Sequence, residues 1–421
     1  MIRQNAAGDG FSMKALAAVV FVCLLIPTSG HAAPPSDDLR AQLARLEQAV
    51  EKIRGLKPLQ AIQTAFVSDQ QFDAAYDRLL HRDLPASDIQ IRQQEFALLG
   101  LLSKSDDLHR VLFQKVSPEV GAFYDEYRKT LYVRNHGDFL VGLRRDLVAR
   151  EYVHALQDQH FNLLKLSPDE SRLRYRNSDA SSAHQALVAG DAVNTEDLFV
   201  FRTYSRTELQ AFARLQSQTS KTPALPKAFE RELDFQYTTG LNFTQKLYDP
   251  NGMGAVDAAY SRLPSSTYEI MHPQAYANHW RLASITLHGV QGFSDWKLAD
   301  DDVLGALGYE LILWQYLDKK RAKNVVDGYG GDRYILLQNG GHDAMLFRSV
   351  WTSGKAADTA RRALIDALRA RFHTIQITVG AGTTVVERDG AAFFSRAGKN
   401  LTMTLAPTAG LAQQLGIAPT T

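Results

Sequence analysis

The residues best suited to chemistry lie at 150–161, which read Arg-Glu-Tyr-Val-His-Ala-Leu-Gln-Asp-Gln-His-Phe. On a helix, Glu151 and His154 lie on one face because they are three residues apart. A helix with the pattern H-E-x-x-H binds zinc through both histidines, and its glutamate activates a metal-bound water molecule. Here Arg150 occupies the position of the first histidine. An arginine stays protonated and has no lone pair to give a metal, so one ligand is missing.

The residues that follow Glu151 resemble a helix of a known family. Residues 154–161 are similar to the helix HELxHALQDQ of a family of secreted bacterial and archaeal zinc metallopeptidases. Four more segments resemble that family in the same order along the chain, at residues 53–59, 120–125, 266–273 and 328–334. The resemblance implies a zincin-like fold of the gluzincin type, in which two histidines and one glutamate hold the zinc that hydrolyses peptides.

The family's third ligand is the glutamate of an Glu-Gly-Asp-Ala segment, and this residue is also replaced here. Residues 187–192 read Leu-Val-Ala-Gly-Asp-Ala, so Ala189 stands in the ligand position while Asp191 is kept. His154 is then the one remaining ligand, and Glu151 keeps the general-base position without its metal. A catalytic zinc site needs three protein ligands and an open position. We therefore expect a metallopeptidase-like protein without catalytic activity and without a cofactor.

A rebuilt metal site is the alternative. Asp158 follows His154 by four residues and shares its helix face, and His184 precedes Ala189 by five residues. These three side chains would be the ligands of zinc in an active peptidase with Glu151 as its base. The other interpretation is that Asp158 and Gln159 support the helix by packing and hydrogen bonding.

Arg150 also suggests what has replaced the metal. A buried guanidinium would lie roughly where the family binds a cation and would pair with Asp191 or Glu151 through charge-assisted hydrogen bonds. An exposed Arg150 is the alternative. Gln157 and His272 complete the residues predicted to lie in or beside the cleft, although a purely structural role for His272 is the alternative.

Composition excludes several classes of protein. Of the 421 residues, 45% are hydrophobic, which is enough for a core and rules out global disorder. The 47 basic and 46 acidic residues give a formal net charge of +1, with no overall footprint for nucleic acid or for an anionic membrane, although local patches remain possible. The single cysteine, Cys23, excludes an internal disulfide and a thiolate-rich zinc site.

The first 33 residues have the features of a secretory signal. An apolar run at 15–26 follows Arg3 and Lys14 and precedes the small residues of 29–33. We expect cleavage after this segment and export to the periplasm or beyond, with Met1 or Met13 as the start. An uncleaved anchor is the alternative, but twelve apolar residues are short for a bilayer. No later stretch is apolar enough to form a transmembrane segment.

The hydrophobic periodicity predicts a mainly α, α+β fold. We expect an N-terminal helical region at 34–118, a zincin-like core at 119–300, a C-terminal α+β unit at 301–406 and a flexible tail at 407–421. The helices are predicted at 39–53, 70–80, 89–102, 139–164, 303–317 and 357–371, with further helices in 223–277. A hairpin is predicted within 120–133, a Gly-rich turn at 327–332, and strands at 334–338, 344–351, 375–379, 384–388, 391–395 and 401–405.

Three functions remain open from the sequence. The first is a binding protein that holds a peptide or an envelope protein in the remnant cleft, with the hairpin at 120–133 as the edge to which a strand adds. The second is the active peptidase with the rebuilt site. The third is a structural protein of the cell envelope.

Overall fold

The computed structural model of the protein describes residues 37–83, 85–103, 105–109, 120–135, 142–166, 176–218, 227–372, 376–379, 382–387 and 390–420. The predicted signal segment and its alternative as an anchor lie outside the described residues. None of the described helices combines the length and the apolarity that crossing a membrane requires.

The N-terminal part begins with three helices that the sequence predicts. They are α1 (Asp37–Arg54), α2 (Asp69–Asp83) and α3 (Ala86–Leu99). In α1 the apolar side chains recur every three or four residues and are buried, as Leu46, Val50 and Ile53 illustrate. The helix ends at Gly55, whose φ of 79° is a left-handed conformation that glycine adopts without steric cost.

The predicted hairpin is confirmed, but it belongs to a larger sheet. Strands β2 (Ala122–Asp125) and β3 (Thr130–Arg134) pair antiparallel, and β1 (Gln63–Val67) pairs with β3 in parallel. The strand order is β1-β3-β2, so β2 is an outer strand. β1 was not predicted, because its five residues alternate too little between apolar and polar side chains to indicate a strand.

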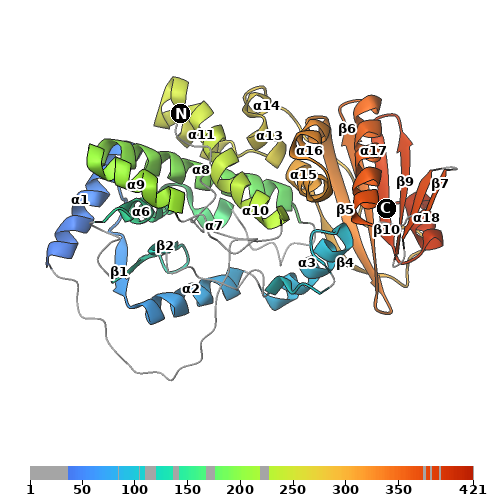
Figure 1. Cartoon of the computed structure of the whole chain (residues 1–421), viewed down its shortest axis with the longest axis horizontal. Coiled ribbons are helices and arrows are strands. Elements are labelled where there is room, and N and C mark those ends of the chain that lie inside the picture. Colours follow the sequence, from blue (N-terminus) through green and yellow to red (C-terminus); the bar gives the residue numbers. More distant parts are fainter. Residues whose placement is uncertain are drawn as a thin grey trace.

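Two long helices, α6 (Arg145–Phe161) and α8 (Ser178–Thr203), form the centre of the N-terminal part. They pack against each other, and α6 also packs on β2 and β3 (Figure 1). Helix α6 begins at Arg145 rather than at residue 139, because residues 142–144 form a bend and a turn. The remaining segments of this part are α7 (Leu163–Leu166), α9 (Arg206–Gln218), α10 (Lys227–Asp234), the π-helix η2 (Phe235–Thr239), α11 (Gly240–Asn251), α12 (Met253–Ser261), α13 (Thr267–Met271) and α14 (Pro273–Ala277).

The C-terminal unit is an antiparallel sheet with helices on both faces (Figure 1). Alternate residues of each strand face opposite sides. Tyr334 and Phe347 face the large core with α15 and α17, whereas Ile335 and Leu346 face a second core with α18. The strand order is β4-β5-β6-β10-β9-β8-β7. The elements are β4 (Lys297–Asp302), α15 (Gly305–Tyr316), α16 (Lys319–Val326), β5 (Tyr329–Asn339), β6 (His342–Trp351), α17 (Gly354–Arg371), β7 (Gln376–Val379), β8 (Thr383–Glu387), β9 (Gly390–Ala397), β10 (Asn400–Ala406) and α18 (Ala409–Ile417).

Three predictions for this unit need correction. The predicted flexible tail at 407–421 contains α18, which buries Ala412 and Leu415 against the sheet. The predicted Gly-rich turn at 327–332 is largely strand, because β5 begins at Tyr329 and accommodates Gly330 through a shift in register. The unit also starts before residue 301, since β4 begins at Lys297.

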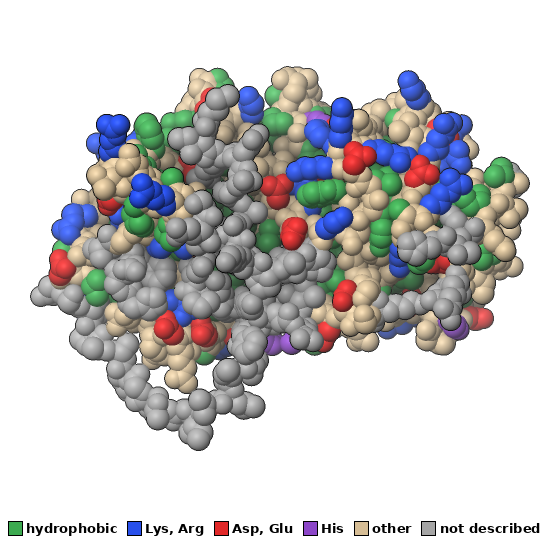
Figure 2. Space-filling view, viewed as in Figure 1, with side chains coloured by type: hydrophobic (Ala, Val, Ile, Leu, Met, Phe, Trp, Pro, Cys, Tyr) green, Lys and Arg blue, Asp and Glu red, His purple; other side chains and the backbone are tan. Residues whose placement is uncertain are grey.

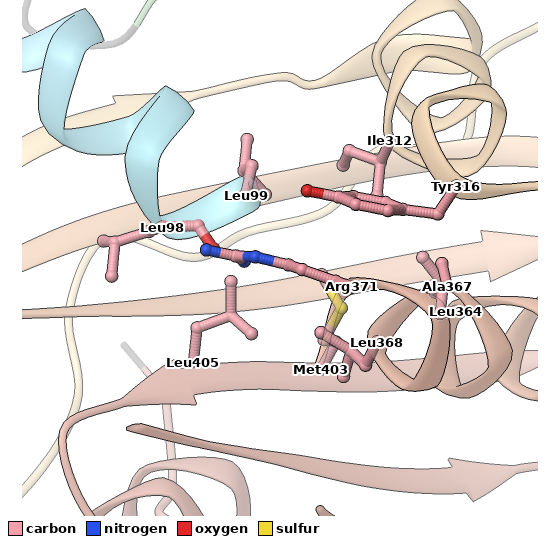
Figure 3. Close-up of a pocket in the computed structure, with 10 residues that line it drawn as sticks. All are labelled: Leu98, Leu99, Ile312, Tyr316, Leu364, Ala367, Leu368, Arg371, Met403 and Leu405. Atoms are coloured by element: carbon pink, nitrogen blue, oxygen red, sulfur yellow. The ribbon is translucent and has the colours of Figure 1, made fainter. Parts of the chain in front are cut away.

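Helix α3 joins the N-terminal part to the C-terminal unit. The guanidinium of Arg371 donates to the carbonyl oxygens of Leu98 and Ala97, at 2.9 and 3.0 Å. Figure 3 shows this side chain reaching from α17 to the end of α3, across a small hollow lined by apolar residues such as Leu405. Tyr316 donates to the carbonyl of Gly100 at 2.5 Å. A cation at the carbonyl end of a helix satisfies groups that the helix itself leaves unpaired, so the two parts are fixed together here.

Candidate functional site

The predicted site residues of α6 lie in a polar layer inside the protein. Arg150, Glu151, His154, Gln157 and Asp158 are all buried. They face α8, the outer strand β2 and segments distant in sequence. Buried polar groups must be hydrogen bonded or paired to be tolerated, and their partners define what each can do.

Arg150 is buried in ion pairs, as one of the two interpretations predicted. Its side chain is 9% exposed. The Nη1 atom lies 3.2 Å from Oε2 of Glu196, and Nε lies 3.6 Å from Oε1 of Glu151. Burial alone lowers the pKa of a guanidinium, but the carboxylates of Glu196 and Glu151 outweigh it and raise the pKa of Arg150. The pairing with Glu151 was predicted, whereas Asp191 is replaced as a partner by Glu196.

Glu196, which the sequence analysis did not single out, is the second carboxylate partner of Arg150. It lies on α8 two helical turns after Ala189 and therefore on the same face. The spacing of seven residues from the lost ligand position was the one signal available in the sequence. The carboxylate at this place pairs with Arg150.

Glu151 does not face open solvent as a general base would. Its Oε2 accepts a hydrogen bond from the backbone N–H of Tyr124 on β2, at 3.1 Å. Burial raises the pKa of Glu151 to about 7, although Arg150 and the Tyr124 N–H oppose this shift. The carboxylate thus ties α6 to the outer strand of the small sheet.

Asp146 completes a group of four buried charged residues, which we call the ionic cluster: Asp146, Arg150, Glu151 and Glu196. Burial and the neighbouring Glu196 raise the pKa of Asp146 to about 8. At neutral pH Asp146 is therefore mostly protonated. Arg150 is the one cation among the four, so the proton on Asp146 reduces the repulsion between the carboxyl groups.

His154 is held in one orientation by Gln157. Its Nδ1 lies 2.7 Å from Oε1 of Gln157. The amide nitrogen of Gln157 donates to Asp191 at 2.8 Å, and a carboxylate only accepts, so this pairing fixes the amide orientation. Nδ1 of His154 must then carry the proton, which leaves the lone pair on Nε2. Burial lowers the pKa of His154 to about 4, so the ring is neutral.

Asp191 belongs to a second polar cluster, centred on Arg54. Nε of Arg54 lies 2.8 Å from Oδ1 of Asp191, and Nη2 donates to Oδ2 at 3.0 Å. Tyr260 also donates to Asp191 at 2.8 Å, while Arg54 reaches Asp257 at 2.6 Å. Arg54 and Asp191 are both fully buried. Two segments that carry the family resemblance, 53–59 and 187–192, thus meet in one bidentate ion pair.

Helix packing also explains the glycine of the Gly-Asp-Ala segment. A Cβ atom on Gly190 would lie 2.2 Å from the carbonyl oxygen of Gly240, and a Cβ on Gly240 would lie 2.2 Å from that of Ala186. Helices α8 and α11 therefore cross at a distance that only glycine permits. Ala189, beside this crossing, is buried and carries no metal-binding atom.

The three side chains of the rebuilt metal site do not converge. Asp158 accepts from the hydroxyl of Tyr124 at 2.8 Å and from Lys129 at 2.6 Å, so it supports the contact between helix and hairpin. His184 pairs through Nδ1 with the carbonyl of Leu166 at 2.7 Å. Within the described ranges, no three His, Cys, Asp or Glu side chains are grouped so that they could hold a metal ion.

The supporting role predicted for Gln159 is confirmed, and the cleft position predicted for His272 is not. Gln159 accepts from the backbone N–H of Leu59 at 2.6 Å and donates to the carbonyl of Gln60 at 3.0 Å. Nε2 of His272 lies 3.3 Å from Oδ1 of Asp327, where α13 and α14 meet the C-terminal unit. Burial lowers the pKa of His272, which is consistent with a structural role.

Comparison with known proteins bears on the C-terminal unit. Residues 296–415 match a family described as a domain of unknown function (DUF8575). The matched segment runs from β4 into α18 and excludes α6 and α8. No curated protein matches the chain, and no solved structure matches it.

Proposed function

We propose that this protein is an exported, non-catalytic relative of the zinc metallopeptidases that acts by binding a peptide or a protein. The observation that carries the proposal is the burial of the Arg150 guanidinium between Glu196 and Glu151 at the position of the first metal ligand. The expectation of export depends on residues 1–33.

The donor set does not fit a catalytic zinc ion. His154 offers one neutral imidazole, Ala189 offers no donor atom, and Arg150 brings a positive charge to the place of the ion. A zinc ion bound to a single imidazole beside a guanidinium would lack the three ligands that a catalytic site uses. We therefore derive no hydrolytic step at this site.

The ionic cluster takes over the structural part of the metal's role. In the family that the sequence resembles, the ion links ligands on two helices. Here Arg150 on α6 and Glu196 on α8 make that link, at 3.2 Å. Hydrogen bonds between charged groups are about twice as strong as those between neutral groups, so a pair of this kind can hold two helices in register.

Binding at the small sheet is supported by the position of β2 and opposed by one contact. β2 is an outer strand, and the N–H of Tyr124 points away from its partner strand β3. A peptide that added as a further strand would need this N–H. Because the Glu151 carboxylate already occupies it, strand addition requires that Glu151 release Tyr124.

The test is to restore the two lost ligands. In the double variant Arg150→His, Ala189→Glu, we expect zinc binding that the wild type lacks, because it restores the two histidines and the glutamate that hold zinc in the family. The matched control is Arg202→His, Ala213→Glu, which introduces the same residue types at exposed positions of α8 and α9. Isothermal titration with zinc measures the affinities. Peptide hydrolysis by the wild type that chelators and Glu151→Gln abolish would refute the proposal and establish the active peptidase.

A further inference from the structure

The C-terminal unit carries a strongly basic surface that lies away from the α6–α8 site. It is formed by α16, α17 and the turn between β9 and β10, and Figure 2 shows blue side chains gathered over α16 and α17. Arg371 is bonded to α3 and is not part of this surface. Without it, segments 318–327, 354–371 and 396–399 hold ten basic and four acidic residues, an excess of six positive charges. The whole chain has a formal charge of only +1, so the charge is concentrated here.

The basic surface is continuous across its three segments. Nη2 of Arg321 on α16 lies 2.5 Å from Asp366 on α17, which joins the two helices. Arg396 near the end of β9 lies at the start of α17, where its Nη1 would be 3.5 Å from a Cβ on Gly354. The backbone of Lys399 accepts from the N–H of Trp351 at 2.9 Å, which fixes the turn beside the same helix.

The acidic residues of this surface already pair with basic residues or cap a helix. Asp366 pairs with Arg321 and Arg369, and Asp358 pairs with Arg361 and Arg362. Asp327 pairs with Lys323, and Asp318 caps the start of α16 through the N–H of Arg321. Arg396 also acts on Asp358, which leaves four basic residues that have no carboxylate partner among the described residues: Lys319, Lys320, Lys355 and Lys399.

We propose that the basic surface docks on an anionic lipid bilayer. Lys355, Arg362 and Arg369 recur every seven residues along α17, so they form one stripe on a helix of 18 residues. Such a helix is about 27 Å long, and with α16 beside it the surface spans many lipid headgroups. Clusters of this size beside a membrane bind anionic lipids through Coulomb attraction.

A flat bilayer fits this surface better than a nucleic acid does. Base recognition uses exposed aromatic rings or an element that enters a groove. Among the described residues, the large exposed hydrophobic side chains are Leu59, Tyr127, Phe201, Leu298, Val379 and Ile417, and all lie outside the basic surface. Trp314, which precedes α16, is covered by Lys319, whose Nζ lies 4.9 Å from its ring centre.

Vesicle sedimentation with the full chain tests this proposal. We expect binding to mixed phosphatidylglycerol–phosphatidylcholine vesicles, weaker binding as salt is raised, and none to pure phosphatidylcholine. The triple variant Lys319→Gln, Lys320→Gln, Lys355→Gln breaks no ion pair. It should bind about a hundredfold more weakly, at about fivefold per charge. The control is Lys52→Gln, Lys227→Gln, Lys246→Gln, which removes three exposed lysines elsewhere and should bind as the wild type does.

Several results would overturn the proposal. The first is that the full chain does not bind anionic vesicles at low salt. The second is that the two triple variants lose binding equally. Equal binding to pure phosphatidylcholine would assign membrane contact to the apolar segment 15–26 instead. Tighter binding to a DNA duplex than to anionic vesicles would assign the surface to nucleic acid.

Discussion

Arg150 is a fixed positive charge in the protein interior, and two carboxylates balance it. Replacing it by alanine leaves Glu196 and Glu151 buried without a cation. Because an unpaired buried charge is costly, we expect Arg150→Ala to lower the free energy of unfolding by about 3–5 kcal/mol. Urea unfolding followed by circular dichroism measures this change.

Arg362→Ala is the matched control for that measurement. Arg362 also pairs with a carboxylate, Asp358 at 2.7 Å, but its side chain is 72% exposed. Exposed ion pairs contribute about 0–1 kcal/mol, so this variant should lose less than about 1 kcal/mol. Equal losses in the two variants would contradict a special role for the ionic cluster.

The raised pKa of Asp146 predicts that the stability of the protein depends on pH. Burial and Glu196 raise its pKa from 3.8 to about 8, so between these values the folded state keeps a proton that the unfolded state releases. This contribution is fully present below pH 3.8 and is lost as the pH rises through about 8. Asp146→Asn cannot lose that proton. Its stability relative to wild type should therefore rise by more than about 2 kcal/mol between pH 4 and pH 8.

Denaturant unfolding across that pH range measures the effect. Asp249→Asn at an exposed position is the control and should leave the pH dependence as in the wild type. A difference between Asp146→Asn and wild type that stays constant with pH would show that Asp146 is ionised in the folded state.

The sequence predicted the pairing of Arg150 with Glu151 but not its pairing with Glu196. The positions of Arg150, Ala189 and His154 within one polar site follow from their spacing and from the resemblance. The sequence did not predict the roles of Glu196 and Arg54, because their partners are distant along the chain. Glu196 pairs with a residue 46 positions away and Arg54 with one 137 positions away. Such pairings depend on how helices cross, which no local pattern specifies.

The crossing of α8 and α11 yields a prediction at the scale of elements. Gly190→Ala places a Cβ 2.2 Å from the carbonyl oxygen of Gly240, so the two helices must separate. We expect a loss of about 3 kcal/mol or more, since overpacking and backbone shifts add together. Thermal unfolding would detect the change.

Gly254→Ala in α12 is its control. A Cβ on Gly254 meets no atom within 4 Å, and alanine is the better helix former. This variant should be about as stable as wild type or slightly more stable. If Gly190→Ala behaves in the same way, the close helix crossing is wrong.

Elements with regular apolar spacing were predicted, and those stabilised by distant charges were not. Helices α1, α2, α3, α15 and α17 follow from their periodicity. β4, by contrast, contains the run Asp300-Asp301-Asp302, which reads as an exposed loop. It is a strand because Arg176 and Arg333 neutralise those buried carboxylates.

At the scale of the molecule, α3 fixes the N-terminal part to the unit that carries the DUF8575 match. Arg371→Ala removes both hydrogen bonds to the end of α3 and opens space beside Gly100. A hydrogen bond from a charged group contributes about 1.5–3 kcal/mol, so we expect a loss of this size. Differential scanning calorimetry measures the loss and shows whether one transition becomes two.

Arg369→Ala provides the comparison for Arg371→Ala. Arg369 lies on the same helix, but its side chain is 58% exposed. Its ion pair is long, with 3.6 Å between Nη1 and Oδ1 of Asp366. Its loss should change the unfolding temperature little. A similar shift in both variants would mean that the junction with α3 contributes no stability of its own.

The division of the chain into a helical part and an α+β part was predictable, whereas this junction depends on the packing of distant segments.

The proposed replacement of the metal by the ionic cluster is tested most directly by the zinc content of the wild-type protein. After incubation with zinc and removal of free ions, mass spectrometry should find far less than one ion per chain, and His154→Ala should leave that content unchanged. One tightly bound zinc per chain that disappears in His154→Ala would contradict the replacement and establish a working metal centre.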